Sequence, residues 1–342
     1  MKALVFREFG GADKLTYEDV PDPKPKPHEV LVRVRACALN HLDIFVREGI
    51  PALKTPLPFW TGCDIAGDVV EVGASVAGVK TGDRVTVNPN LTCDRCEFCL
   101  AGEHSLCIRY GIVGEHVPGG LAELVAVRGD RVLPLPSQIA YEAAASFILT
   151  NMTAWRMVVT QGRVRPGQDV LILGVGGGVS STAVQIAKLC GARVIVTSSS
   201  DAKLEKARAL GADVGINYAR DDWAKKVWEL TAARGVDLVV ENVGTATWKQ
   251  SIRSLKNGGR LVTCGATSGP VGETLIPLVF WKQVHIIGST MANNKEFSDV
   301  MSLFFNGRLR AIIDEVVPLK DGAAAQRRLA EGKQFGKIVL VP

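Results

Sequence analysis

Residues 170–180 read VLILGVGGGVS, an apolar run that stops in a cluster of glycines. Residues 181–189 follow with small and apolar side chains at helical spacing. A strand, a glycine turn and a helix in this order bring free backbone N–H groups and a helix N-terminus to one point, which is typical of a phosphate site. A plain tight turn is the alternative, and the rest of the chain decides between the two.

Strand-like and helix-like stretches alternate after about residue 153. The predicted strands lie at 170–173, 193–197, 214–217, 236–240 and 260–264, with a further strand at 284–289. The predicted helices lie at 180–189, 202–210, 222–231 and 245–256. This alternation indicates an α/β Rossmann domain, a doubly wound parallel sheet with helices on both faces. Ser180 stands where a dinucleotide fingerprint usually has glycine or alanine, and it is small enough for the helix to pack.

The residues after the second predicted strand favour one dinucleotide over another. An acidic side chain at this point would bind an adenosine 2′-hydroxyl and repel a 2′-phosphate. The chain instead has three serines at 198–200, followed by Asp201 and then Lys203. Hydroxyls and an ammonium suit a 2′-phosphate, so we expect NADP(H) rather than NAD(H). We expect Asp201 to be the N-cap of the next helix, and a solvated Lys203 is the alternative to a phosphate contact.

The first part of the chain reads as short strands. They are predicted at 29–36, 69–72, 83–87 and 122–127. Their alternating pattern and the glycine-containing turn between the second and third are typical of a barrel-like meander. An apolar helix is expected near 141–159, and residues 293–342 mix helix and strand.

Four cysteines stand close together in the loop-like segment 88–120. They are Cys93, Cys96, Cys99 and Cys107. Four thiolates at this spacing can close a tetrahedron around Zn²⁺, with Zn–S distances of about 2.3 Å. Such a site has no open coordination position, so it braces a loop and does no chemistry. An iron–sulfur cluster is the alternative, because sulfur ligands suit it as well.

The composition is that of an ordinary globular protein and excludes several classes. The 342 residues are 47% apolar and 22% charged, with a net charge of +5 and no dense basic block, so nucleic acid is not an expected partner. No apolar segment approaches the roughly 20 residues that span a bilayer, and residues 1–8 do not resemble a secretory signal. We expect a cytoplasmic protein with a small-molecule substrate, whose eight cysteines bind metal or are buried thiols.

Together these motifs resemble the medium-chain dehydrogenase/reductase superfamily over essentially the whole chain. The resemblance is carried by LNHLD at 39–43, TGCDIAG at 61–67, GDRV at 82–85, the cysteine lobe and the glycine turn. It implies a GroES-like β-barrel catalytic domain at 1–153 and 291–342, with a zinc lobe at 88–110. It also implies a Rossmann NADP(H)-binding domain at 154–290.

The resemblance is split between zinc alcohol dehydrogenases and quinone reductases, and the split bears on the mechanism. Zinc alcohol dehydrogenases of this superfamily take catalytic-zinc ligands from three places, where this chain has Asn40, Cys63 followed by Asp64, and Leu149. Only Cys63 of the three positions could still bind a metal, and an ordinary catalytic zinc needs three protein ligands. We therefore expect one structural zinc and no catalytic zinc.

Without zinc, hydrogen-bond donors or a bound water must stabilise the substrate oxygen that gains negative charge. The candidate catalytic residues are Asn40, His41, Cys63, Asp64 and Thr153. Structural alternatives stay open for three of them. Asn40 with Asp43 suits the N-cap of a helix that starts at His41, His41 suits a surface position, and Cys63 suits a small buried side chain.

The resemblance also carries cofactor contacts onto the second domain. They fall at the glycine turn, around the 2′-phosphate and at the ends of the later strands. The residues are Gly174, Gly176, Gly177, Gly178, Val179, Ser199, Ser200, Lys203, Tyr218, Asn242, Gly265, Ala266, Thr267, Gly288, Ser289 and Thr290. Tyr218 also suits an adenine-side hydroxyl by its position after a strand, and a solvent-facing tyrosine is the alternative.

The expected activity is that of an NADP(H)-dependent alcohol dehydrogenase or carbonyl reductase, which moves hydride between nicotinamide and a ketone or aldehyde and its alcohol. Reduction of an activated C=C bond in a quinone or enone is the alternative activity. A cofactor-binding protein without catalysis is the alternative from another class. Because an apolar edge strand needs a partner, the strand at 284–289 predicts a homodimer or homotetramer.

Overall fold

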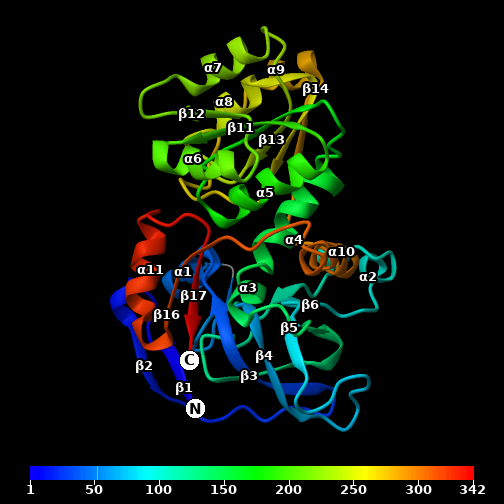
Figure 1. The fold of residues 1–342 in the computed structure, drawn as a ribbon, viewed down its shortest axis with the longest axis vertical. Helices are drawn as coiled ribbons and strands as arrows, with labels where there is room; N and C mark the ends of the chain where they lie inside the picture. The colour runs from blue at the N-terminus through cyan, green and yellow to red at the C-terminus, as the bar shows by residue number, and fades with distance from the viewer. Residues whose placement is uncertain (52) are drawn as a thin grey trace. The chain divides into compact units, whose positions relative to one another are not determined.

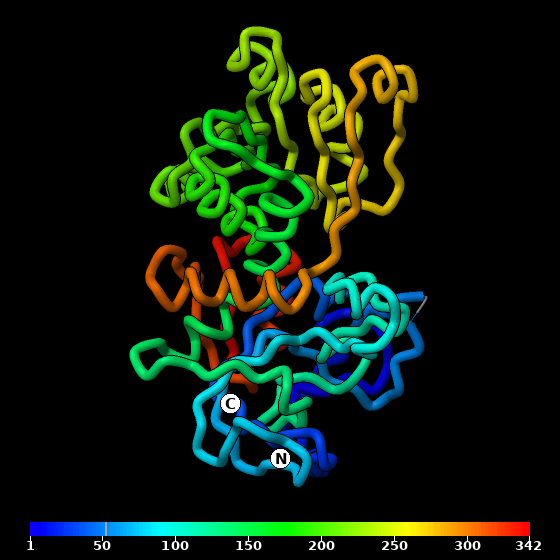
Figure 2. The backbone as a smooth tube through the Cα atoms, turned by 90° about the vertical axis from the view of Figure 1, so that its right-hand side faces the viewer, coloured from blue at the N-terminus to red at the C-terminus, as the bar shows by residue number. Residues whose placement is uncertain are grey.

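The computed structural model describes residues 1–51 and 53–342, and the chain separates into two compact units. Unit 1 contains residues 1–149 and 293–342, and unit 2 contains residues 150–292 (Figure 1). Both chain termini belong to unit 1 (Figure 2). The domain boundaries expected after residues 153 and 290 lie four and two residues from the boundaries after 149 and 292.

Unit 2 is built on a six-stranded parallel sheet with the order β12-β11-β10-β13-β14-β15. Its strands are β10 (Asp169–Ile172), β11 (Arg193–Ser198), β12 (Val214–Asn217), β13 (Val236–Glu241), β14 (Leu255–Thr263) and β15 (His285–Gly288). Its helices include α5 (Gly178–Leu189), α6 (Asp201–Ala209), α7 (Trp223–Leu230), α8 (Trp248–Arg253) and α9 (Ile276–Lys282). The strand order reverses beside β10, which is where doubly wound sheets bind ligands at the carboxyl ends of their strands.

The centre of this sheet is apolar because helices cover a parallel sheet on both faces. Leu171 lies opposite Ile195 of β11 on one side and Val239 of β13 on the other. All three side chains are fully buried in one cluster. Each fully buried aliphatic side chain contributes about 1.5–3 kcal/mol, so this row holds the end of β10 in a fixed place.

Unit 1 is organised around a sheet with the order β16-β17-β3-β4-β5-β9, in which β8 also pairs with β3. These strands are β3 (Glu29–Ala38), β4 (Asp64–Val72), β5 (Arg84–Val87), β8 (Leu124–Arg128), β9 (Val132–Pro134), β16 (Ile313–Pro318) and β17 (Lys337–Val341). The two-stranded sheets are β1 (Lys2–Phe6) with β2 (Leu15–Asp19), and β6 (Asn90–Leu91) with β7 (Gly111–Ile112). The helices of unit 1 include α1 (His41–Glu48), α2 (Glu97–Leu100), α3 (Tyr141–Ala145), α10 (Asn294–Phe305) and α11 (Gly322–Ala330).

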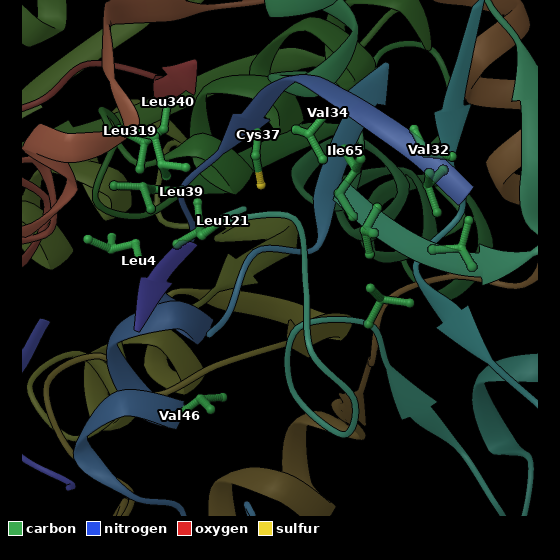
Figure 3. Close-up of a cluster of buried hydrophobic side chains, with 14 of the residues drawn as sticks. Leu4, Val32, Val34, Cys37, Leu39, Val46, Ile65, Leu121, Leu319 and Leu340 are labelled. Atoms are coloured by element: carbon green, nitrogen blue, oxygen red, sulfur yellow. The ribbon is translucent and has the colours of Figure 1, made fainter. Parts of the chain in front are cut away.

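The core of unit 1 joins side chains from distant parts of the chain (Figure 3). Leu4, Leu39, Leu319 and Leu340 are each at most 2% exposed and belong to one cluster. Leu39 directly precedes Asn40, so the core fixes the backbone from which the Asn40 side chain projects.

Two predicted helices differ from the structure. The apolar helix expected near 141–159 is divided into α3, α4 (Leu149–Trp155) and a π-helical segment (Arg156–Gln161). The N–H of Leu149 donates to the Asp64 carboxylate at 2.8 Å, as carboxylates do at the start of a helix. The helix expected at 245–256 is the shorter α8, because Leu255 already pairs with Val236 in the sheet. No helix in the described part of the chain is long and apolar enough to cross a membrane.

Candidate active site

A hydrogen-bonded cluster of polar side chains lies at the start of α1 in unit 1. The Lys337 ammonium Nζ donates to Asn40 Oδ1 at 2.5 Å and to Asp64 Oδ2 at 2.8 Å. The Asn40 amide Nδ2 donates to the same Asp64 oxygen at 2.9 Å. The Lys337 and Asp64 side chains are 4% and 0% exposed, so each charge is buried and is balanced by the other.

The register of three strands brings this cluster together. Ala38, at the end of β3, lies opposite both Asp64 of β4 and Val339 of β17. Asn40 follows two residues after Ala38, and Lys337 stands two residues before Val339. Segments from opposite ends of the chain therefore meet because β17 pairs with β3.

Cys63 and Leu149 complete the surroundings of the Asp64 carboxylate. The Cys63 sulfur lies 3.4 Å from Asn40 Nδ2 and 3.8 Å from Asp64 Oδ1, the oxygen that also accepts the Leu149 N–H. Burial, followed by the charge of Asp64, raises the pKa of the Cys63 thiol well above its usual value. The side chain is 1% exposed and fits the alternative of a small buried residue.

Asn40 is the N-cap of α1, and its side chain also belongs to the cluster. The Asp43 carboxylate accepts the N–H of Asn40 at 2.7 Å and that of Gly62 at 2.9 Å, which holds the helix start. His41 is the next residue, and it is half-buried. Burial, and then the positive charge of Lys337, hold the pKa of His41 below its usual 6.5, so the imidazole is neutral at pH 7.

The four predicted zinc cysteines also meet in unit 1. The sulfur atoms of Cys93, Cys96, Cys99 and Cys107 all lie within 4.8 Å of one another. Sulfurs around a tetrahedral Zn²⁺ are about 3.8 Å apart when Zn–S distances are about 2.3 Å. The tetrad therefore fits a structural zinc. Within residues 1–51 and 53–342, no other group of three or more histidine, cysteine or acidic side chains has the spacing of a metal site.

Backbone N–H groups support Cys96 and Cys107 as thiolates, whereas burial raises the pKa of the Cys99 thiol to about 12. The N–H groups of Cys93 and Arg109 each donate to the Cys107 sulfur at 3.3 Å. The N–H groups of Cys99 and Ile108 lower the pKa of the Cys96 thiol to about 6. Hydrogen bonds of this kind stabilise the charged form of cysteine, which is the form that binds zinc.

Polar contacts attach the zinc lobe to the rest of unit 1. Asp94 accepts from Arg128 at 2.5 Å and from Arg131 at 2.6 Å, both on the segment around β8 and β9. On another side, the N–H of Asn294 at the start of α10 contacts His104 Nδ1 at 3.5 Å. A metal that crosslinks the lobe would therefore stiffen a loop that is already anchored on both sides.

In unit 2 the glycine turn joins β10 to α5, as predicted. The first hydrogen bond of α5 runs from the N–H of Ser181 to the Gly177 oxygen at 3.0 Å. The N–H groups of Gly178 and Val179 precede it and have no intrahelical acceptor. Gly176 has a φ of +127°, and a Cβ at this residue would lie 2.8 Å from Cδ of Lys203. N–H groups at a helix start beside a lysine fit a phosphate of a dinucleotide.

Ser180 explains how this chain departs from the usual dinucleotide fingerprint. Its hydroxyl donates to the Leu173 oxygen at 2.7 Å and accepts from Asn242 Nδ2 at 3.0 Å, and the residue is fully buried. The serine thus ties α5 to the end of β10 and to the loop after β13. Asn242, a predicted cofactor residue, is held beside the turn.

The residues after β11 correct the prediction for Asp201. The N-cap of α6 is Ser200, whose hydroxyl accepts the Lys203 N–H at 3.4 Å, and Asp201 is the first helical residue. Asp201 Oδ1 instead accepts from Asn217 Nδ2 at 2.9 Å and from Arg220 at 2.7 Å. These two donors from the end of β12 draw the carboxylate away from the helix start.

Two cations therefore lie on the segments predicted to bind the 2′-phosphate. Lys203 is beside Gly176, and Arg220, which the sequence reasoning missed, is paired with Asp201. The sequence feature that could have indicated Arg220 is its position two residues after Tyr218. Tyr218 itself is 48% exposed, which agrees with a ligand contact and with a solvent-facing side chain.

The ends of the later strands carry the remaining predicted cofactor residues. Glu241 is buried and accepts the N–H groups of Val243 and Gly244 at 2.7 and 3.0 Å, which orders the loop that holds Asn242. The Ser289 hydroxyl, after β15, is buried and has no hydrogen-bond partner among the described residues. A buried hydroxyl without a partner fits a polar ligand group such as a carboxamide. The other residues of this set are Gly265, Ala266, Thr267, Gly288 and Thr290, which follow or end β14 and β15.

Comparisons with known proteins identify the family. Residues 26–137 match the alcohol dehydrogenase GroES-like domain, and residues 178–306 match the model of zinc-binding dehydrogenases. An alcohol dehydrogenase from Geobacillus stearothermophilus is 34% identical over 99% of this chain and 99% of its own. The chain belongs to the medium-chain dehydrogenase/reductase superfamily. The predicted fold class, a GroES-like domain with a Rossmann domain, is confirmed.

Other members of the superfamily extend this similarity. A crystal structure of an NAD-dependent alcohol dehydrogenase is 46% identical, with a TM-score of 0.95 and 100% of both chains covered. An acryloyl-coenzyme A reductase from Sulfurisphaera tokodaii is 30% identical over 100% of both chains. The chain is therefore an oxidoreductase of the medium-chain dehydrogenase/reductase type.

Four of the five predicted catalytic residues lie together in this superfamily member. They are Asn40, His41, Cys63 and Asp64. Thr153 belongs to unit 2, where its hydroxyl contacts the Met291 sulfur at 3.9 Å. Sequence reasoning missed Lys337. In the sequence it is simply a lysine at the start of the apolar strand KIVLV.

Proposed function

We propose that the chain is an NADP(H)-dependent alcohol dehydrogenase or carbonyl reductase that works without a catalytic zinc. The observation that carries the proposal is the Lys337 ammonium, 2.5 Å from Asn40 and 2.8 Å from Asp64. In the zinc alcohol dehydrogenases that the chain resembles, the positions of Asn40 and Cys63 supply metal ligands. Here a positively charged side chain contacts Asn40 and the carboxylate of Asp64, the residue after Cys63.

Two physical arguments support the absence of a catalytic zinc. Zinc in catalytic sites takes three protein ligands from thiolate, imidazole and carboxylate groups, whereas Asn40 and Leu149 offer a neutral amide and a hydrocarbon. A dication would also be repelled by the buried ammonium. Two unit charges 4 Å apart interact by about 4 kcal/mol at an effective dielectric constant of about 20, and a double charge doubles this. The buried ammonium therefore opposes a zinc ion at this place.

The dinucleotide, when bound, supplies or accepts the hydride. In this proposal the glycine turn and the start of α5 bind its pyrophosphate, and Lys203 with Arg220 binds the 2′-phosphate that distinguishes NADP(H) from NAD(H). The Ser289 hydroxyl, which has no hydrogen-bond partner among the described residues, orients the nicotinamide end. The polar cluster around Asp64 meets the substrate oxygen.

Lys203→Ala is expected to raise the KM for NADPH by about 10- to 100-fold, because a hydrogen bond to a charged group contributes about 1.5–3 kcal/mol. The KM for NADH should change less than about twofold, since that cofactor has no 2′-phosphate. Lys206→Ala, on the exposed side of the same helix, is the matched control and should leave both values unchanged. Equal turnover of the unaltered chain with NADH and NADPH would refute the cofactor assignment.

The activity itself is tested by following NADPH oxidation with two substrate panels. One panel contains aliphatic and aryl ketones and aldehydes, and the other contains enones and quinones. We expect turnover on the first panel. Turnover on the second panel alone would overturn the carbonyl-reductase assignment, and tight NADPH binding without turnover on either panel would favour a cofactor-binding protein.

Reduction of an activated C=C bond is the second candidate function. The similarity to an acryloyl-coenzyme A reductase over the full chain favours it. Both reactions place negative charge on a carbonyl oxygen, as alkoxide in one case and as enolate in the other, so both need a donor such as the cluster around Asp64. They differ in the carbon that receives the hydride.

We also propose that two copies of the chain pair through β15. This strand is the last in the sheet order, and exposed apolar side chains surround it on the edge of unit 2. They are Ile276, Phe280, Trp281 and Ile286, with Trp281 82% exposed. Unpaired edges and apolar patches of this kind mark association sites. Ile286→Lys should convert the dimer or tetramer expected in sedimentation velocity into smaller species, while Val316→Lys, on an exposed strand of unit 1, should not.

A further inference from the structure

A pocket of about 310 Å³ lies among three helices of unit 2, α7, α8 and α9, which pack against one another in this order (Figure 1). Its lining residues are Ala224, Lys225, Trp228, Arg253, Ser254 and Lys282. Three of these six side chains carry a positive charge, one is aromatic and none is acidic. The volume is at the lower end of the range of about 300–1,000 Å³ for ligand pockets, so the pocket suits a small molecule.

The positive charge of this pocket is not balanced by the protein. No described carboxylate forms an ion pair with any of the three lining cations. Cations outside the pocket on the same helices do have partners, since Lys226 pairs with Asp221 at 3.7 Å and Lys249 pairs with Glu273 at 3.2 Å. The unpaired charge is therefore concentrated where the surface is hollowed, and it favours an anionic ligand.

Lys282 is fixed at one side of the pocket. Its ammonium Nζ donates to the backbone oxygens of Arg253 at 2.9 Å and Leu255 at 2.8 Å. The same nitrogen lies 5.4 Å from the centre of the Trp228 ring. Burial lowers the pKa of Lys282 from its usual value. A bound anion would supply the negative charge that this half-buried ammonium lacks.

Helix capping explains Lys282 but not the whole pocket. A lysine beside the last carbonyl groups of a helix stabilises the helix end, and Arg253 is the last residue of α8. Capping needs neither the Arg253 guanidinium nor Lys225, which are both exposed. Trp228 is 41% exposed, although Val227 before it is fully buried in the core of unit 2. Two further cations and an indole ring are therefore available to a ligand.

The pocket is separate from the glycine turn that is proposed to bind the dinucleotide. Helices α5 and α6 carry the chain from β10 toward β12, whereas α8 and α9 carry it from β13 toward β15. Right-handed crossovers that run in opposite directions along a sheet place their helices on opposite faces. Ser254 also directly precedes β14, at the amino ends of the strands, whereas the turn follows the carboxyl end of β10. A dinucleotide at the turn would therefore leave this pocket free.

We propose that the pocket is a second anion site of unit 2, which binds a small phosphate monoester with an aromatic group, such as a nucleoside monophosphate. The phosphate, with a charge of about −1.5 to −2 at pH 7, accepts hydrogen bonds from Lys225, Arg253 and Lys282. The base stacks on the exposed part of Trp228, because every base has a face that suits an aromatic side chain. This site goes beyond the proposed function and does not depend on it.

Binding of AMP to the full chain, measured by calorimetry with saturating NADPH present, tests the site. We expect Lys225→Ala and Arg253→Ala each to raise the Kd for AMP by about 10- to 100-fold, because each removes a hydrogen bond to a charged group. Lys226→Ala and Lys249→Ala are the matched controls, since they remove one positive charge from the same helices outside the pocket. They should change the Kd by less than about twofold. No AMP binding at millimolar concentration, or equal losses in pocket and control variants, overturns the proposal.

Ribose 5-phosphate, which has no base, tests the aromatic part of the site. Trp228→Leu should weaken AMP binding by about 5- to 150-fold, the range for loss of one stacked base. The same variant should leave the Kd for ribose 5-phosphate within about twofold, and Trp228→Phe should retain most of the affinity for AMP. Equal affinities of the unaltered chain for AMP and ribose 5-phosphate would overturn the assignment of an aromatic ligand.

Competition with NADPH separates this site from the dinucleotide site. We expect the Kd for AMP to be the same in Lys203→Ala as in the unaltered chain. Displacement of AMP by NADPH would place AMP at the glycine turn and would overturn the proposal. If the chain binds no NADPH, the proposed function fails, and the Lys225 and Arg253 variants with their controls still decide whether AMP binds in the pocket.

Discussion

Gly176→Val is expected to weaken NADPH binding by about 100-fold, or about 2.7 kcal/mol. Gly176 has a φ of +127°, a region that β-branched residues avoid, and it stands between β10 and the start of α5. A valine there must change the backbone of the turn and displace Lys203, whose Cδ would lie 2.8 Å from the new Cβ. Both the N–H groups and the ammonium proposed to bind phosphate would move. Fluorescence titration with NADPH measures the effect.

Gly167→Val is the matched control for backbone strain. Gly167 also lies in unit 2 with a positive φ of +80°, and a Cβ there would meet nothing within 4 Å. We expect a loss of stability of about 1–3 kcal/mol from the strained backbone, with the NADPH affinity unchanged. Equal losses of affinity in the two variants would contradict a phosphate site at the turn.

Cys107→Ser is expected to abolish stable zinc binding and to lower the melting temperature. Cys107 is buried, and its sulfur accepts two backbone N–H groups that stabilise a thiolate. The bond from Cys93 to Cys107 through the metal closes a loop, and a crosslink across about 15 residues contributes about 3 kcal/mol. For a unit of this size, the corresponding shift is about 6–12 °C. Metal analysis after dialysis and thermal unfolding measure the two effects.

Cys190→Ser is the control for this variant. Cys190 lies at the end of α5 in unit 2, outside the tetrad, and is only partly buried. It should keep one zinc and the original melting temperature. A Cys107→Ser variant with full zinc content would contradict the four-cysteine site.

Local patterns made most of the fold predictable from the sequence. The alternation of strands and helices after residue 153, the glycine turn and the cysteine spacing each occupy a short stretch of chain. In each of these motifs, the residues that matter interact with residues only a few positions away in the sequence. The Rossmann sheet and the cysteine tetrad could therefore be recognised without coordinates, and the GroES-like unit was expected from the resemblance to the superfamily.

Long-range contacts could not be predicted in this way. Lys337 is 297 positions from Asn40, and only the pairing of β17 with β3 brings them together. A single lysine at the start of an apolar strand is more often a solvated end than a buried charge. The sequence therefore indicated Asn40, His41, Cys63, Asp64 and Thr153 as candidates and missed Lys337, which contacts both Asn40 and Asp64.

Competing side chains explain the local errors. Asp201 and Ser200 are both good N-caps, and the choice depended on Asn217 and Arg220, which reach Asp201 from the next strand. Likewise, the apolar run from 141 to 159 had the composition of one helix. The Asp64 carboxylate, from β4, starts a new helix at Leu149 within that run.

Zinc analysis of the chain in its active form tests the central claim most directly. The protein should be purified without added chelator, assayed with NADPH and its best carbonyl substrate, and measured for zinc by mass spectrometry on the same sample. One zinc per chain, retained in Cys190→Ser and lost in Cys107→Ser, is the result predicted for a chain with one structural zinc and no catalytic zinc. Two zincs per chain, with the second removed together with activity by mild chelation, would contradict it.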